Sequence, residues 1–90
     1  MEYKIGKNRI YLENNAKNIV AEICFEELED KVYNIYHTYV DEEYRGQGIA
    51  TRLMEYALDE INRRGGKVSA TCSYAKKYLK EKDDGKKYCR

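Results

Sequence analysis

The sequence has 90 residues, a formal net charge of +1, 42% hydrophobic and 37% charged residues, and ten tyrosines beside one phenylalanine. A chain of this length buries one compact core, so we predict a single domain over residues 1–90, and its aromatic content is typical of folded rather than disordered proteins. The near-neutral charge provides no field of the kind that nucleic-acid-binding proteins use, so DNA and RNA are not expected partners.

Three strand patterns occupy the first half of the chain. Residues 9–13 predict a short strand, and residues 18–26 alternate like a half-buried strand with Ile19 on its apolar face. Residues 32–40 are dense in β-branched and aromatic side chains, which is typical of a central strand. We expect these three segments to form an antiparallel meander.

The second half begins with a helical pattern. Apolar residues recur at helical spacing from Ile49 to Ile61 and stop before Gly65-Gly66, which predicts the main helix. Residues 67–73 return to strand character, and residues 74–82 predict a short final helix.

The order of these elements predicts the topology. A strand, a helix and a second strand in so short a chain imply a right-handed crossover, with the strands at residues 32–40 and 67–73 paired in parallel. The final helix is expected to turn Tyr78 and Leu79 inward. The predicted class is α+β, with a mixed β-sheet made of the antiparallel meander and a parallel βαβ crossover.

The turn before the main helix contains two glycines, in the segment Arg45-Gly46-Gln47-Gly48-Ile49-Ala50. Glycines allow a ligand to approach the backbone closely, and the first N–H groups of a helix point outward at the positive end of its dipole. The turn therefore indicates a phosphate or pyrophosphate pocket, and an ordinary glycine-containing connection is the alternative. The nucleotide P-loop is excluded because no Lys-Ser or Lys-Thr follows Gly48, and the dinucleotide fingerprint lacks its third small residue.

Family signatures surround this turn. Arg45, Gly48 and Ala50 match the pattern Arg/Gln-x-x-Gly-x-Gly/Ala of the GNAT superfamily, after a predicted strand and at the start of an amphipathic helix. The flanking segments His37-Thr38-Tyr39-Val40 and Cys72-Ser73-Tyr74 add to the likeness. Over about residues 7–82 the chain resembles the minimal GNAT-like N-acetyltransferases, very short proteins that keep the coenzyme-binding half of the fold. It departs from them at Ala70, where a proline often stands.

The resemblance implies a compact GNAT-like fold that uses acetyl-coenzyme A as cosubstrate. It implies that the backbone amides of residues 47–50 hold the pyrophosphate, and that the pantetheine arm lies between the strands that end near Val40 and Ser73. The thioester is then expected near His37 and Cys72. The implied coenzyme-binding residues are Val40, Arg45, Gly46, Gln47, Gly48, Ile49, Ala50, Thr51, Ser73, Tyr74 and Tyr78.

Acyl transfer to an amine needs a base for the amine proton and an acid for the leaving thiolate. His37 is the only histidine, and histidine exchanges protons near neutral pH, so it is the candidate base. The alternative is a structural histidine on an aromatic face shared with Tyr33, Ile35 and Tyr39.

Cys72 is the second candidate catalytic residue. It falls in phase with Val68 and Ala70 on the predicted inner face, where a cysteine often acts as a small apolar side chain. If His37 comes within hydrogen-bond reach, Cys72 is instead a reactive thiolate, as nucleophile or as general acid. Tyr74 and Tyr78 either protonate the departing thiolate or cap the core.

The remaining composition restricts compartment and ligands. The odd number of cysteines, without a CxxC pair, favours a reducing cytoplasm over a disulfide framework. No signal-peptide pattern or membrane-span length is visible, and no His/Cys/Asp/Glu cluster has metal-ligand spacing, so neither a membrane nor a metal is expected. Residues 76–90 carry seven basic and three acidic side chains, and their end, residues 83–90, is expected to be a frayed tail. This segment is either a solvated face or an aid to binding the coenzyme's phosphates, through Lys76, Lys77, Lys80 and Lys82 in particular.

We therefore predict an acetyl-coenzyme-A-dependent N-acetyltransferase whose acceptor is a small amine or a protein lysine. Two alternatives belong to other classes. One is a coenzyme-A-binding module without turnover, because the N-terminal helices that usually wall the acceptor site are missing. The other is a basic-tailed protein-interaction module that keeps only the fold.

Overall fold

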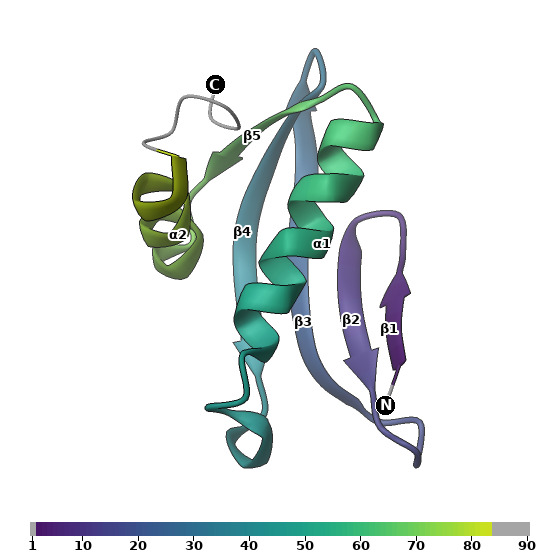
Figure 1. Cartoon of the computed structure of the whole chain (residues 1–90). Helices are drawn as coiled ribbons and strands as arrows, with labels where there is room; N and C mark the ends of the chain where they lie inside the picture. The colour runs from purple at the N-terminus through teal and green to yellow at the C-terminus, as the bar shows by residue number, and fades with distance from the viewer. Residues whose placement is uncertain (1, 84–90) are drawn as a thin grey trace.

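The computed structural model describes residues 2–83, which form a five-stranded sheet with a long helix across one face (Figure 1). Strands β1 to β4 pair in antiparallel fashion in chain order, and β5 adds to β4 in parallel, which confirms the predicted α+β class and mixed sheet. In chain order the elements are β1 (Glu2–Ile5), β2 (Arg9–Glu13), β3 (Ile19–Glu29), β4 (Val32–Val40), the 3-10 helix η1 (Glu42–Tyr44), α1 (Ile49–Arg63), β5 (Lys67–Ala70) and α2 (Ser73–Asp83).

Three strands differ from the prediction. Strand β3 continues to Glu29, beyond the predicted end at residue 26. Strand β1 was not predicted, because four residues are too few to show a pattern, and it pairs along its length with β2. Strand β5 ends at Ala70 rather than at residue 73, since the N–H groups of Thr71 and Cys72 both donate to the carbonyl of Ile35 and the chain turns there into α2. Of the predicted tail at residues 83–90, all but Asp83 lies outside the described residues.

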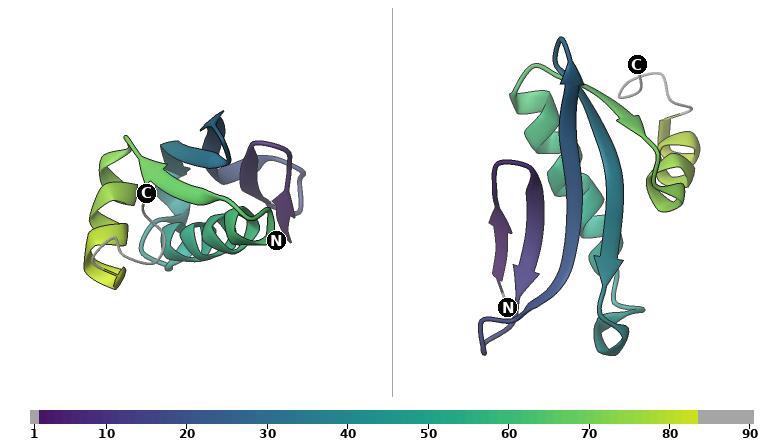
Figure 2. Two further views of the ribbon diagram at one scale, coloured as in Figure 1. Left: turned by 90° about the horizontal axis from the view of Figure 1, so that it is seen from above. Right: turned by 180° about the vertical axis from the view of Figure 1, so that it is seen from behind.

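The core lies between α1 and one face of the sheet. The buried stripe of α1, from Ile49 to Ile61, packs on apolar side chains of β2 to β5, and Leu79 of α2 joins the same cluster as predicted. The opposite face of the sheet has no helix of the described residues over it, as the view from behind in Figure 2 shows. None of the helices described is both long and apolar enough to span a membrane.

Two irregularities in strand pairing change which side chains face the core. A register shift between Leu12 and Glu13 leaves Val20 buried and Ile19 38% exposed, so the predicted inward placement of Ile19 was wrong. A second shift, between Cys24 and Phe25, affects β4. Since an extra residue in one strand reverses the alternation beyond it, the side chains of β4 change faces at this point.

The second shift decides where His37 lies. Phe25 pairs with Ile35, but Cys24 pairs with His37, so Tyr36 is the extra residue of a bulge. Beyond the bulge, Thr38 is paired with the fully buried Ile23 and therefore faces α1. His37 faces the uncovered side of the sheet, and the prediction that it shares a face with Ile35 was wrong.

Candidate functional site

The parallel strands β4 and β5 separate at one end, and this opening forms the inner part of the site. Their pairing stops at Ile35 and Ala70, whereas β4 continues to Val40. Residues 36–40 therefore have no described strand beside them on the β5 side. Backbone groups of this edge are available to a ligand, because an unpaired strand edge retains free donors and acceptors.

The turn after β4 is held in shape by its own polar contacts. The carboxylate of Asp41 accepts from the N–H of Glu43 at 3.0 Å, and the Nε of Arg45 donates to the carbonyl of Val40 at 3.0 Å. Gly46 and Gly48 follow with φ values of +82° and +75°, which favour glycine. The sequence thus forms a compact turn that places Gly48 directly before α1.

The first amides of α1 are open to an anion. Gly48 is the N-cap of α1 and provides no capping side chain, so the N–H groups of the first turn have no side-chain acceptor from that position. A Cβ placed on Gly46 or Gly48 meets no other atom within 4 Å. The backbone is therefore accessible from outside, and the helix dipole makes this place favourable for negative charge.

A groove runs from this turn along α2. Its inner cavity of about 190 Å³ adjoins an outer cavity of about 590 Å³, and Thr51 and Tyr74, whose hydroxyl oxygens lie 3.3 Å apart, line both. Of the eleven predicted coenzyme-binding residues, only Gln47 and Ser73 are absent from the two linings. The inner lining is Val40, Tyr44, Arg45, Gly46, Gly48, Ile49, Ala50, Thr51 and Tyr74, and the outer lining is Thr51, Tyr74, Lys77, Tyr78 and Glu81.

Two lining residues, Tyr44 and Glu81, were not predicted, and Lys77 was predicted only as one of four lysines that either assist the coenzyme's phosphates or form a solvated face. Tyr44 directly precedes the glycine turn, and this proximity was the available signal for it. Lys77 and Glu81 lie on the face of α2 that also carries Tyr74 and Tyr78, since residues three and four apart share a helix face. Their spacing from Tyr74 and Tyr78 could have identified them from the sequence.

Cys72 lies directly before α2, beside the opening between β4 and β5, and does not line either cavity. Its Sγ is 3.4 Å from the Oγ1 of Thr38, and its carbonyl accepts from the N–H of Lys76, as an N-cap residue does. Burial raises the pKa of the Cys72 thiol, but the Thr38 hydroxyl and the amides of Ala75 and Tyr74 stabilise the thiolate more strongly. The net result is a pKa below the ordinary value for cysteine.

His37 is not near Cys72, and the predicted contact between them is absent. The Nε2 of His37 lies 3.6 Å from one carboxylate oxygen of Glu22, whose other oxygen is 3.1 Å from the Nη1 of Arg9. His37 is instead the cross-strand neighbour of Cys24. Burial, and then the carboxylate of Glu22, raise the pKa of the Cys24 thiol, so this cysteine is not an activated one.

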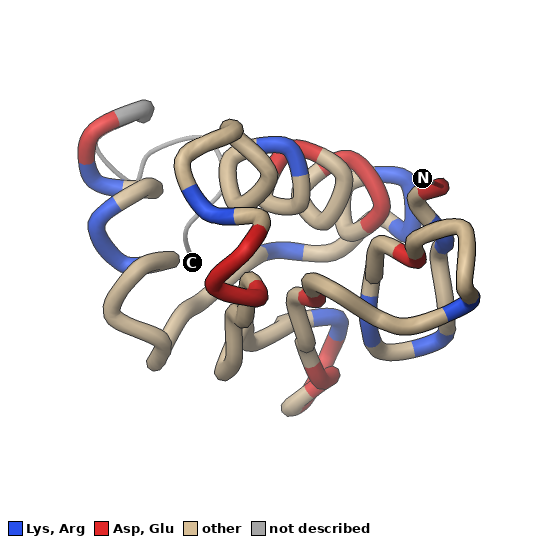
Figure 3. Tube along the Cα trace, turned by 90° about the horizontal axis from the view of Figure 1, so that it is seen from below, with Lys and Arg blue, Asp and Glu red and all other residues tan. Residues whose placement is uncertain are grey.

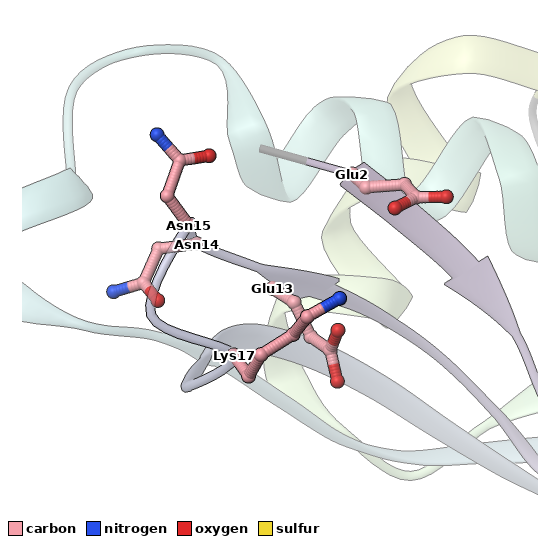
Figure 4. A pocket seen from close by; sticks show the side chains of 5 residues that line it. All are labelled: Glu2, Glu13, Asn14, Asn15 and Lys17. Atoms are coloured by element: carbon pink, nitrogen blue, oxygen red, sulfur yellow. The ribbon is translucent and has the colours of Figure 1, made fainter.

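A separate hollow of about 350 Å³ lies at the turn between β2 and β3 (Figure 4). Glu2 and Glu13 contribute carboxylates, and Asn14, Asn15 and Lys17 complete its lining. It shares no lining residue with the groove. Among the residues described, no group of three or more His, Cys, Asp or Glu side chains is arranged to hold a metal ion.

Comparison with known sequences gives two kinds of match. The sequence model of the family described as GCN5-related N-acetyl-transferase matches residues 9–88. Protein NATD1 of Gallus gallus is 38% identical over 61 residues, which are 68% of this chain and 56% of the relative. Protein NATD1 of Homo sapiens is also 38% identical over 61 residues, 68% of this chain and 54% of the relative. The chain thus matches little more than half the length of these relatives.

Two solved structures show how far the fold is shared. The solution structure of a GCN5-like protein from Staphylococcus aureus has a TM-score of 0.79 and 30% sequence identity, with 99% of this chain and 87% of that chain covered. The crystal structure of the GNAT family N-acetyltransferase YhbS from Escherichia coli in complex with CoA has a TM-score of 0.63 at 24% identity. It covers 69% of this chain and 38% of that chain, and it shows the shared fold.

Proposed function

Because the chain belongs to the GCN5-related N-acetyl-transferase family, we propose that it transfers the acetyl group of acetyl-coenzyme A to an amine. The observation that carries the proposal is the cavity that extends from the open amides at Gly48 to Val40, the last residue of the free edge of β4. A ligand with a pyrophosphate in its middle and a thin uncharged arm fits this arrangement. The unpaired cysteines Cys24 and Cys72 support a reducing cytoplasm as the place of the reaction.

The chemistry of the groove walls supports one orientation of the coenzyme. The pyrophosphate belongs at the amides that follow Gly48, where the helix dipole favours negative charge. The pantetheine arm belongs along Val40 and the free edge of β4, because its amide groups can pair with strand backbone. This arrangement brings the thioester toward Thr38 and Cys72.

The two candidate catalytic side chains then act from opposite faces of the sheet. The amine nitrogen attacks the thioester carbon, and His37 on the uncovered face takes the amine proton. The carbon–sulfur bond breaks as the acetyl group passes to nitrogen, and the thiol of Cys72 gives its proton to the coenzyme thiolate. His37 and Cys72 return to their starting states by exchanging protons with water. The products are an N-acetylated amine and free coenzyme A.

The position of Glu22 supports the role of His37 as base. Glu22 is fixed by Arg9, and its second oxygen faces the imidazole, so a protonated His37 has an opposite charge 3.6 Å away. The side chain of His37 is 47% exposed, which leaves it accessible to an acceptor that approaches over the open face. Both a small amine and a protein lysine can reach such a surface.

Two other functions are tested by the same experiment. Acetyl-coenzyme A is incubated with the protein and a panel of amines, including a polyamine and a lysine-containing peptide, and acetylated products are measured by mass spectrometry. We expect one amine class to be acetylated at a rate above a protein-free control. Acetyl-coenzyme A binding without product for any amine would support a coenzyme-binding module instead. Absence of binding would contradict the proposal and support the protein-interaction module.

The same samples distinguish direct transfer from a covalent route. In the covalent route, Cys72 attacks the thioester and carries the acetyl group before the amine does. Incubation without amine would then add one acetyl mass to the peptide that contains Cys72. Because His37 is not beside Cys72, we propose direct transfer and expect no acetylated Cys72 during turnover.

A further inference from the structure

The outer cavity of the groove has no assigned ligand in the scheme above. Its volume of about 590 Å³ lies in the range of about 300–1,000 Å³ that is usual for small-molecule sites. It meets the inner cavity at Thr51 and Tyr74, so a ligand held at the glycine turn can extend directly into it. It is therefore large enough for a second part of the same ligand.

Aromatic and basic side chains of α2 line this cavity. The rings of Tyr74 and Tyr78 lie with centroids 6.3 Å apart and planes inclined by 42°, and both side chains are half-buried against the core. Lys77 lies between them in the sequence and lines the same cavity with an exposed side chain. Figure 3 shows the lysine positions along α2, in blue, beside the first turns of α1. The wall thus combines ring faces for stacking with a positive charge.

The two directions along the groove differ in chemistry. Towards the sheet, Val40 and Ile49 line the inner cavity, which ends beside the free edge of β4. Towards the far part of α2, the lining is Lys77, Tyr78 and Glu81. Coenzyme A has an uncharged arm on one side of its pyrophosphate, and an adenosine with a 3′-phosphate on the other. Tyr44 and Arg45 line the inner cavity at the glycine turn itself, where the pyrophosphate is proposed to lie. Beyond that turn, the outer direction presents a further cation to the 3′-phosphate and ring faces to the base.

We propose that Tyr74, Tyr78 and Lys77 form a subsite for the 3′-phosphoadenosine end of the coenzyme, with the ammonium of Lys77 on the 3′-phosphate. The proposal rests on the proposed function, because it takes the pyrophosphate to lie at the glycine turn. Base–aromatic stacking is sequence-independent chemistry that one tyrosine ring can supply. The carboxylate of Glu81 lines the same cavity and repels the phosphate, so it weakens binding and restricts the phosphate to the Lys77 side.

The test compares two ligands on matched variants. Dissociation constants for coenzyme A and for 3′-dephospho-coenzyme A are measured by calorimetry on the parent protein, on Lys77→Gln and on Lys80→Gln. Lys80 lies on the same helix, is exposed and does not line the cavity, so its variant has the same charge change without the contact. We expect the parent to prefer coenzyme A by about tenfold, as one charge-assisted contact allows. Lys77→Gln should lose most of this preference, and Lys80→Gln should keep it.

A second variant is expected to increase the affinity for coenzyme A, an effect that partial unfolding cannot cause. Glu81→Gln removes the repulsion, so it should bind coenzyme A more tightly than the parent and leave dephospho-coenzyme A nearly unchanged. Equal binding of both ligands by the parent would overturn the subsite. Equal losses in Lys77→Gln and Lys80→Gln would also overturn it, since only a distant charge effect acts equally from both positions. Binding of neither ligand by the folded parent would overturn the proposed function itself.

Discussion

The Sγ of Cys72 lies 3.4 Å from the Oγ1 of Thr38, across the opening where β4 and β5 separate. The Thr38 hydroxyl stabilises the Cys72 thiolate, and so do two backbone amides in the first turn of α2. The pKa of Cys72 therefore lies below its ordinary value despite burial. In contrast, burial and the nearby Glu22 raise the pKa of Cys24. The two thiols should therefore differ in reactivity.

Alkylation measures this difference. In a Cys89→Ser background, which leaves Cys24 and Cys72 as the two thiols, we expect iodoacetamide at pH 7.5 to modify Cys72 several-fold faster than Cys24. The rates are obtained from the two cysteine-containing peptides by mass spectrometry. Equal rates, or faster modification of Cys24, would show that the local donors do not activate Cys72.

The donor responsible is identified by two variants. Thr38→Val removes the hydroxyl that stabilises the thiolate, so the pKa of Cys72 should rise and its alkylation at neutral pH should slow about two- to tenfold. Thr38→Ser keeps a hydroxyl and should restore most of the rate. His37→Gln should leave the alkylation rate of Cys72 unchanged, because His37 lies on the other face of the sheet. A loss of Cys72 reactivity in His37→Gln would contradict this placement.

The sequence predicted the helix and the turn but not the face of the sheet on which His37 lies. The reason is that the first two depend on neighbouring residues, and the third depends on residues distant in sequence. The stripe from Ile49 to Ile61 and the glycines before it are local patterns, and α1 and its N-terminus lie where they indicated. The bulge at Tyr36 arises from the pairing of β4 with β3. Residues 32–40 alone show no interruption, so their alternation was extended through the bulge and the contact between His37 and Cys72 was wrongly expected.

The groove also depends on contacts that are distant in sequence. Tyr74 was predicted to bind coenzyme by resemblance, but its position beside Thr51 results from the crossover that brings α2 to the start of α1. The sequence left Lys77 among four lysines that either lie on a solvated face or assist the coenzyme's phosphates, and no local pattern distinguished it from Lys76, Lys80 and Lys82. Its place in the outer cavity depends on the packing of Leu79 and Ala75 into the core, which sets the rotation of α2.

The glycine turn allows a matched comparison. Gly48 and Gly65 both have φ of +75°, so an alanine at either position introduces similar backbone strain of about 1 kcal/mol. Gly48→Ala places a methyl group where the pyrophosphate is proposed to approach, and we expect acetyl-coenzyme A to bind about tenfold more weakly. Gly65→Ala, at the other end of α1, should match it in thermal stability and retain parent affinity. Equal affinities of the two variants would contradict a phosphate site at Gly48.

The acid stability of the fold should depend on Glu60. Its side chain is 6% exposed, and it accepts from the Nη2 of Arg63 at 2.6 Å and from the Nε of Arg64 at 2.7 Å. The hydrogen bonds from Arg63, and after them those from Arg64, lower the pKa of Glu60. Burial opposes them, and the net change is from 4.5 to about 2. The ionised carboxylate therefore stabilises the fold above pH 4.5, and this stabilisation is lost as the pH falls from 4.5 towards 2.

Urea unfolding across this pH range tests the assignment. Glu60→Gln should lower the free energy of unfolding at pH 7 by about 1–3 kcal/mol and reduce its decline between pH 4.5 and 2. Glu55→Gln is the control. Glu55 lies on the same helix, but its side chain is exposed and its carboxylate is as far as 3.9 Å from the Nε of Arg52. A pH dependence that is the same in Glu60→Gln and in the parent would show that another group causes the acid transition.

The central claim, that the glycine turn and the groove beside α2 bind acetyl-coenzyme A, is tested most directly by amide chemical shifts. Uniformly ¹⁵N-labelled protein is titrated with acetyl-coenzyme A, and the shift changes are mapped on the assigned backbone. We expect the largest changes at residues 44–52, with a second group at residues 72–78 along the groove. Saturating changes that avoid residues 44–52, for example around the separate hollow at Asn14, or no change at millimolar ligand, would contradict the claim.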